Sequence, residues 1–167
     1  MSEPCPNPAA FRIWDQFGNL VYDSGDILER ITSAPGIFNS DNEANQSIDT
    51  RSDNKGPKPE AIAVGSIGAN TYAFVGLERI GGVATFDVTN PHQTRFVSYS
   101  NNRDFSTVVN LTFDPDAAGD LGPEGIAFIP ATESPTGAPL VVVANEVSGT
   151  TTIFSVIESV FRNGFED

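Results

Sequence analysis

Several residue types are scarce in this 167-residue chain, and each scarcity excludes a class of site. Cys5 is the only cysteine, so neither an internal disulfide nor a cysteine-rich metal site can form. His92 is the only histidine and falls in the turn-like stretch TNPHQTR, which argues against a histidine-dependent catalytic triad or zinc site. Catalysis or metal binding would therefore depend on carboxylates and basic side chains.

Basic residues and long apolar runs are also scarce. Nine Lys and Arg stand against 22 Asp and Glu, for a formal net charge of −13, and this field would repel phosphate backbones and anionic lipid surfaces. No stretch approaches the roughly 18 apolar residues of a membrane-spanning helix, and MSEPCPNPAAF contains no run that could serve as a signal peptide. We therefore expect a globular, acidic protein with no nucleic-acid partner and no membrane span.

Short strand-like segments make up most of the chain. Each is rich in β-branched and aromatic residues and is bounded by Gly, Asn, Asp or Pro. No helical apolar period is sustained, except that IESVF near the C-terminus could form one turn of helix. The sequence predicts an all-β fold with strands at 10–15, 20–25, 61–67, 71–78, 82–88, 94–100, 125–131, 139–146 and 150–157.

Two similar phrases, GPKPEAIAV at 56–64 and GPEGIAFIP at 122–130, indicate an internal repeat. Glu124 follows Glu60 by 64 residues and Glu146 follows Glu78 by 68, so the second copy has a longer first hairpin. Such runs of short strands are typical of the antiparallel blades of a WD40-like or YVTN-like β-propeller. Because closed propellers have about four to eight blades, we expect an incomplete propeller whose edges meet further blades or another copy of the chain.

The repeat divides the chain into six parts. A Gly18–Asn19 turn joins the two strands that precede the first complete blade. The predicted parts are the outer strands of a preceding blade (1–26), an acidic inter-blade loop (27–58), a complete four-stranded blade (59–100), a second inter-blade loop (101–122), three strands of the next blade (123–157) and a C-terminal sorting-like tail (158–167).

Propeller topology predicts that the four repeated glutamates gather at one rim, with Glu60 near Glu78 and Glu124 near Glu146. Neighbouring carboxylates repel each other and are stabilised by a cation or a shared proton, and hard oxygen ligands suit calcium. Two alternatives stay open, since the carboxylates could instead lock blade to blade through backbone N–H groups, or take part in catalysis. The candidate ligands for calcium are Glu60, Glu78, Glu124, Glu146, Asp53, Asp114, Asp116 and Asp120.

Basic residues in the same loops are candidates for binding an anionic ligand. A guanidinium group matches phosphate or carboxylate, although each could equally pair with a neighbouring acid. Trp14, in FRIWD, is expected in the core rather than on a stacking platform. The candidate ligand-binding residues are Arg51, Arg79, Arg103 and Lys55.

The phrases YAFVGLER, GPEGIAFIP and VVANEVSGTTT resemble those of the choice-of-anchor I family, relatives of the mesenchyme-specific cell-surface glycoprotein of biomineralising animals. The likeness covers residues 10–157 and implies the C-terminal portion of a longer, secreted β-propeller. The ending FRNGFED is similar to the Phe-rich tails of exported bacterial proteins. The resemblance therefore implies a location outside or on the surface of a bacterial cell.

These observations favour a non-enzymatic, exported scaffold or binding module with calcium as the candidate cofactor. Some members of the family carry alkaline phosphatase or phytase-like labels, which gives the alternative of a calcium-dependent phosphoester hydrolase. In that alternative the rim carboxylates would hold calcium and the basic residues would hold phosphate. The few basic residues and the lack of a histidine in the rim favour the first reading.

Overall fold

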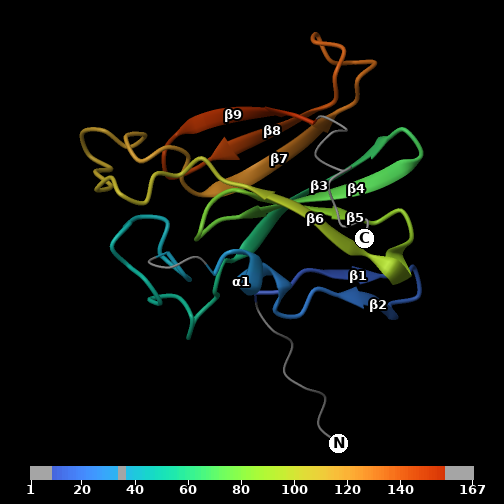
Figure 1. The fold of residues 1–167 in the computed structure, drawn as a ribbon, viewed down its shortest axis with the longest axis horizontal. Coiled ribbons are helices and arrows are strands. Elements are labelled where there is room, and N and C mark those ends of the chain that lie inside the picture. Colours follow the sequence, from blue (N-terminus) through green and yellow to red (C-terminus); the bar gives the residue numbers. More distant parts are fainter. Residues whose placement is uncertain (1–8, 34–36, 157–167) are drawn as a thin grey trace, which may run out of the picture.

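Antiparallel strands form nearly all the regular structure of the computed structural model, which describes residues 9–33 and 37–156. Nine strands form three sheets, which lie one after another in chain order (Figure 1). The predicted all-β, antiparallel class is confirmed, and one strand overlaps each of the nine predicted segments. The helical turn expected at IESVF and the predicted tail at 158–167 lie outside the described residues.

The first sheet is a hairpin of β1 (Arg12–Trp14) and β2 (Leu20–Asp23). A turn closes it, in which Gly18 has a φ of 81° and the Asp15 carboxylate accepts hydrogen bonds from the backbone N–H and the side-chain amide of Asn19. A short helix, α1 (Ile27–Ile31), follows at a place where the sequence predicted only loop.

Helix α1 has only five residues, too few to show a helical period in the sequence, and it forms because of its tertiary packing. Its Leu28 is completely buried, and the Thr32 hydroxyl donates a 2.8 Å hydrogen bond to the Leu28 carbonyl at the C-terminal end. One buried side chain therefore fixes a helix that no sequence pattern reveals.

The middle sheet has the order β3-β4-β5-β6, formed by β3 (Pro59–Ile67), β4 (Asn70–Leu77), β5 (Val83–Asp87) and β6 (Arg95–Ser100). A short 3-10 helix, η1 (Pro91–Gln93), separates the last two strands. All residues of β4 from Tyr72 onwards are buried, because both faces of this sheet are covered there. Such two-sided burial explains the unbroken apolar run of the sequence.

The third sheet has the order β7-β8-β9, formed by β7 (Pro123–Ile129), β8 (Leu140–Asn145) and β9 (Thr150–Ser155). Its β7 lies against β3 and β4 of the middle sheet. The rings of Phe74 and Phe128 stack there with centroids 5.7 Å apart, and such aromatic pairs are worth about 0.5–1.5 kcal/mol beyond their buried area.

Two apolar cores hold the three sheets together. One joins the hairpin and α1 to the middle sheet and includes Phe11, Leu28 and Phe86. The other joins the middle sheet to the third sheet and includes Phe74 and Val143. Alternate residues of the same strands supply the two cores, as the period of a β-strand requires.

Trp14 is not a core residue, contrary to the sequence-based prediction. Its side chain is 56% exposed, whereas its neighbour Ile13 packs against the first core. The single-residue alternation of the strand therefore directs Trp14 to the outer face of the hairpin. Among the described residues, no helix is both long enough and apolar enough to cross a membrane.

Candidate functional site

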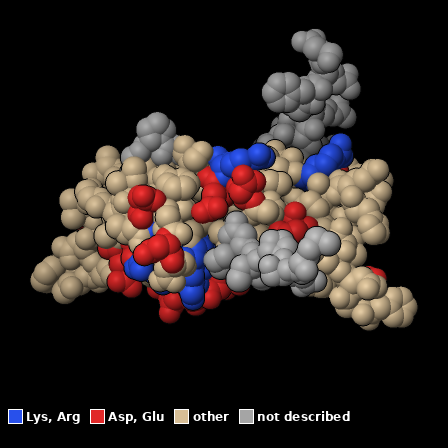
Figure 2. Space-filling model, turned by 90° about the horizontal axis from the view of Figure 1, so that it is seen from below, with Lys and Arg blue, Asp and Glu red and all other residues tan. Residues whose placement is uncertain are grey.

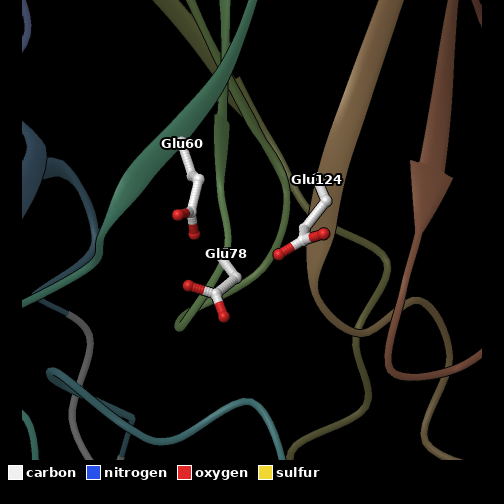
Figure 3. Close-up of side chains that lie close together, drawn as sticks. All are labelled: Glu60, Glu78 and Glu124. Carbon is white, nitrogen blue, oxygen red and sulfur yellow. The ribbon is translucent and has the colours of Figure 1, made fainter.

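Three glutamates from two sheets converge at the rim where the long loops lie. One carboxylate oxygen from each of Glu60, Glu78 and Glu124 lies within 4.8 Å of the others. Figure 3 shows the three side chains directed toward a common space, from the start of β3, the end of β4 and the start of β7. Among the described residues this is the one group of three or more potential metal ligands of this kind.

Two β-bulges direct the glutamates toward the rim. The strand register shifts between Pro59 and Ala61, and again between Pro123 and Gly125, so that Glu60 and Glu124 are the extra residues. A bulge re-aims a side chain without ending the strand. The equivalent positions in the two phrases thus have the same local geometry.

Lys58 lies inside this group and neutralises part of its charge. Its Nζ is 2.6 Å from Glu60 Oε2 and also forms an ion pair with the buried Glu78. The hydrogen bond from Lys58 lowers the pKa of Glu60. Partial burial alone would lower the pKa of Lys58, but its hydrogen bonds to Glu60 and Glu78 raise it. The ammonium therefore favours the ionised form of Glu60.

The second glutamate pair has no such lysine in the equivalent place. Lys58 has a φ of 55°, and the residue 64 positions later, Gly122, has a φ of 73°. The hydrogen bond to Glu146 raises the pKa of Glu124, and the charges of Glu146 and the first pair raise it further. This pair is suited to sharing a proton or a cation rather than to pairing with a base.

Asp41 links two arginines beside the glutamates. Its carboxylate forms an ion pair with Arg51 and accepts a 3.2 Å hydrogen bond from Arg79 Nη1. Arg79 also donates to the side chain of Asn42, which in turn donates a 3.1 Å hydrogen bond to Glu78. Figure 2 shows Lys and Arg side chains next to Asp and Glu rather than in a separate basic patch.

Arg103 is a buried tie between the two long loops, with 6% of its surface exposed. Its guanidinium donates to Asn45 Oδ1 at 2.8 Å, to the Arg79 carbonyl at 2.9 Å and to the Asp41 carbonyl at 2.6 Å. It also lies over the ring of Phe105, 4.6 Å from the centroid. Burial lowers its pKa to about 10. These contacts occupy the group that the sequence made a candidate for anion binding.

The remaining predicted residues do not join the glutamate group. Asp53, Lys55, Asp114 and Asp116 are exposed on the two long loops. Asp120 is 9% exposed and turns inward.

The inward carboxylate of Asp120 ties the second loop to the third sheet. It accepts hydrogen bonds from the hydroxyls of Thr150 and Thr152 on β9 and from the Asn102 amide. Burial alone would raise the pKa of Asp120, but these three hydrogen bonds lower it. The structure thus gives Asp120 a bracing position, apart from Asp114 and Asp116.

Lys58 and Asn45 are contact-forming residues of this rim that the sequence-based candidates did not include. A signal for Lys58 was available, because it stands where the second phrase has Gly122 and so takes a backbone conformation that favours glycine. No sequence signal marks Asn45, whose amide donates to the carbonyls of Asp104 and Thr107 across the loops.

Comparison with known proteins places the chain in a family. Residues 10–91 match the family model described as the choice-of-anchor I domain. The chain belongs to the choice-of-anchor I family. In a separate comparison, this choice-of-anchor I chain is similar to Gigasin-3a of Magallana gigas, with 34% identity over 145 residues. The match covers 81% of the chain and 51% of Gigasin-3a. The chain thus spans about half the length of this relative, and no solved structure matches it.

Proposed function

We propose that this chain is a non-enzymatic scaffold and binding module of an exported or cell-surface β-propeller. The observation that carries the proposal is the internal pairing of the charged rim. Lys58 forms ion pairs with both Glu60 and Glu78, and the guanidinium of Arg103 donates to carbonyl groups of the protein itself. Membership of the choice-of-anchor I family supports the location outside the cell.

The propeller architecture is supported by the equivalence of the middle and third sheets. In the middle sheet the Glu78 amide donates a 2.9 Å hydrogen bond to the Lys58 carbonyl, and in the third sheet the Glu146 amide donates a 2.8 Å bond to the Gly122 carbonyl. Each bond ties the loop that enters a sheet to that sheet's second hairpin. Repeated contacts of this kind are expected between equivalent blades.

In this proposal Lys58, Glu60 and Glu78 form a brace at the edge of the middle sheet, next to Glu124 of the third sheet. Glu60 and Glu78 belong to the middle sheet and Glu124 to the third, so their mutual positions depend on how the sheets pack. Lys58 offsets part of the repulsion that three carboxylates would otherwise impose on the contact. The long loops above them remain available to a partner, as loops on a rigid scaffold commonly are.

Calcium binding by the same glutamates is the second candidate, favoured by the convergence of three carboxylates within 4.8 Å. Oxygen ligands of this type suit calcium. The hydrogen bond to Glu146 raises the pKa of Glu124, and so do the charges of the neighbouring glutamates, which a cation would offset. A calcium ion there would compete with the Lys58 ammonium for Glu60 and Glu78.

The phosphoester hydrolase alternative gains no support from the described residues. Arg51 and Arg79 pair with Asp41, and Arg103 is buried among carbonyl groups, so three of the four candidate phosphate ligands already have partners. The fourth, Lys55, is exposed.

Surface labelling of intact cells tests the location. A membrane-impermeant amine reagent should modify the exposed Lys55 without cell lysis. Modification only after lysis would contradict a surface module. A parallel assay of p-nitrophenyl phosphate and phytate with calcium should show no release of phosphate by the purified chain. Release that disappears in Glu78→Gln but persists in the exposed-site control Asp53→Asn would establish the hydrolase instead.

A further inference from the structure

The second long loop, residues 101–122, is fastened at its base and ends in an exposed turn. At the base, the Asp104 amide donates a 2.8 Å hydrogen bond to the Ala118 carbonyl. Near the tip, Asn110 and Asp114 form an isolated antiparallel β-bridge. Figure 1 shows this loop, in yellow to gold, at the left-hand end of the molecule, beyond the ends of the strands. The turn that follows Asp114 therefore faces solvent from a fixed base.

This turn contains the one Asp-Pro sequence of the chain, Asp114 followed by Pro115. Pro115 has the second position of the turn, which proline favours, and the Ala117 amide closes the turn with a 3.4 Å hydrogen bond to the Asp114 carbonyl. On the other side, the Asp114 amide donates a 3.0 Å hydrogen bond to the Asn110 carbonyl. Hydrogen bonds thus hold the main chain on both sides of the Asp114–Pro115 peptide bond.

The side chain of Asp114, in contrast, is not held. It is exposed, and within the described residues no hydrogen bond or ion pair engages its carboxyl group. Asp104 of the same loop differs, because its carboxylate accepts hydrogen bonds from Ser106 and Thr107. The carboxyl group of Asp114 is therefore able to turn toward the carbonyl group of its own residue.

We propose that the Asp114–Pro115 peptide bond is a self-cleavage site of the folded chain. A carboxyl oxygen of Asp114 attacks the carbonyl carbon of the same residue and forms a cyclic anhydride. The bond from that carbon to the Pro115 nitrogen breaks, and the carboxyl proton goes to the nitrogen. Water then opens the anhydride. The net reaction is hydrolysis of one peptide bond, which gives a chain that ends at Asp114 and a chain that begins at Pro115.

Three features of the turn favour cleavage at this bond. The Pro115 nitrogen belongs to a tertiary amide, and it accepts the proton and leaves more readily than an ordinary peptide nitrogen. The Ala117 N–H is directed at the carbonyl oxygen on which negative charge develops during the attack, and a donor placed in this way stabilises the transition state. Finally, the carboxyl group and the carbonyl belong to one residue, so the attack is intramolecular.

The two pieces should stay together after cleavage, because the third sheet packs on the middle sheet. β7 lies against β3 and β4, and the rings of Phe74 and Phe128 stack across this contact. Asn102 of the first piece also donates a hydrogen bond to Asp120 of the second. Cleavage would therefore convert the module into two associated chains without separating its sheets.

Incubation of the full chain in mild acid tests the cleavage, at the lowest pH, down to about 4, at which circular dichroism still shows the native fold. Mass spectrometry should find the pieces 1–114 and 115–167, while size-exclusion chromatography should show one species of unchanged size. At the same pH in urea, where the turn is lost, cleavage should be at least about tenfold slower. Absence of these pieces, or equal rates with and without urea, would overturn the proposal.

Matched variants separate self-cleavage from the action of a contaminating protease. Asp114→Asn removes the attacking carboxyl group and should abolish cleavage, whereas Asp116→Asn, an exposed position in the same turn, should cleave at the rate of the wild type. Ala117→Pro removes the N–H that closes the turn and should slow cleavage to the rate found in urea. The same pieces from Asp114→Asn, their loss in Asp116→Asn, or an unchanged rate in Ala117→Pro would each contradict the mechanism.

Discussion

Replacement of Arg103 by Met should lower the melting temperature substantially, because Arg103 joins both long loops to the middle sheet. Methionine keeps an apolar stem against Phe105 but removes the donors to Asn45, to the Arg79 carbonyl and to the Asp41 carbonyl. Leaving three such acceptors without their donor costs about 1 kcal/mol each at the low end, or about 3 kcal/mol in all. For a chain of this size, that corresponds to a fall of about 6–12 °C.

A circular-dichroism thermal melt measures this change. The matched control is Arg95→Met, since Arg95 pairs with Asp87 at 2.8 Å while its side chain is 75% exposed. Exposed ion pairs contribute about 0–1 kcal/mol, so the control should melt within about 4 °C of the wild type. If Arg103→Met also melts within about 4 °C of the wild type, Arg103 does not brace the loops.

Three further predictions concern the sheets and the rim. Gly65→Ala should lower the free energy of unfolding by about 1–3 kcal/mol in urea melts, because its Cβ would overlap Phe128, whereas Gly125→Ala, with only a 3.4 Å contact, should change it by under about 0.5 kcal/mol. Because folding raises the pKa of Glu124, the folded chain is favoured when this carboxyl is protonated. That contribution to stability is fully present below the ordinary pKa of a glutamate and is lost as the pH rises through the raised pKa. Glu124→Gln should therefore gain melting temperature relative to the wild type between about pH 4 and 7, and a constant difference would contradict this coupling. Lys58→Gly should melt below the wild type at pH 7, and the difference in melting temperature between the two should shrink in acid. The reason is that the lowered pKa of Glu60 stabilises the wild type only while the pH stays above that pKa.

The strands and the approach of the glutamates could be predicted because both depend on local pattern. Alternating β-branched and aromatic residues between turn formers define each strand, and hairpin topology then places Glu60 beside Glu78. The approach of Glu124 to both could not be predicted in this way, because it depends on the packing of one sheet on another. That packing is set by contacts such as Phe128 against Gly65, which lie far apart in sequence.

The roles of the charged residues could not be predicted from their type. Arg103 and Asp120 belong to loops with no regular pattern, and only the folded chain shows that both side chains turn inward to bind other parts of the protein. Lys58 differs, because comparison of the two phrases shows a lysine where the other has Gly122. A residue that takes a left-handed conformation costs about 1 kcal/mol or more, which its ion pairs to Glu60 and Glu78 offset.

The most direct test of the brace formed by Lys58, Glu60 and Glu78 is a thermal melt of the chelator-treated chain with and without about 5 mM calcium. Because the Lys58 ammonium is already paired with both Glu60 and Glu78, the brace predicts that the melting temperature changes by less than about 1 °C. A rise of about 5–10 °C, as expected for calcium at a hundred times its dissociation constant, would contradict it if Glu124→Gln abolished the rise. The three glutamates would then be a calcium site rather than a brace.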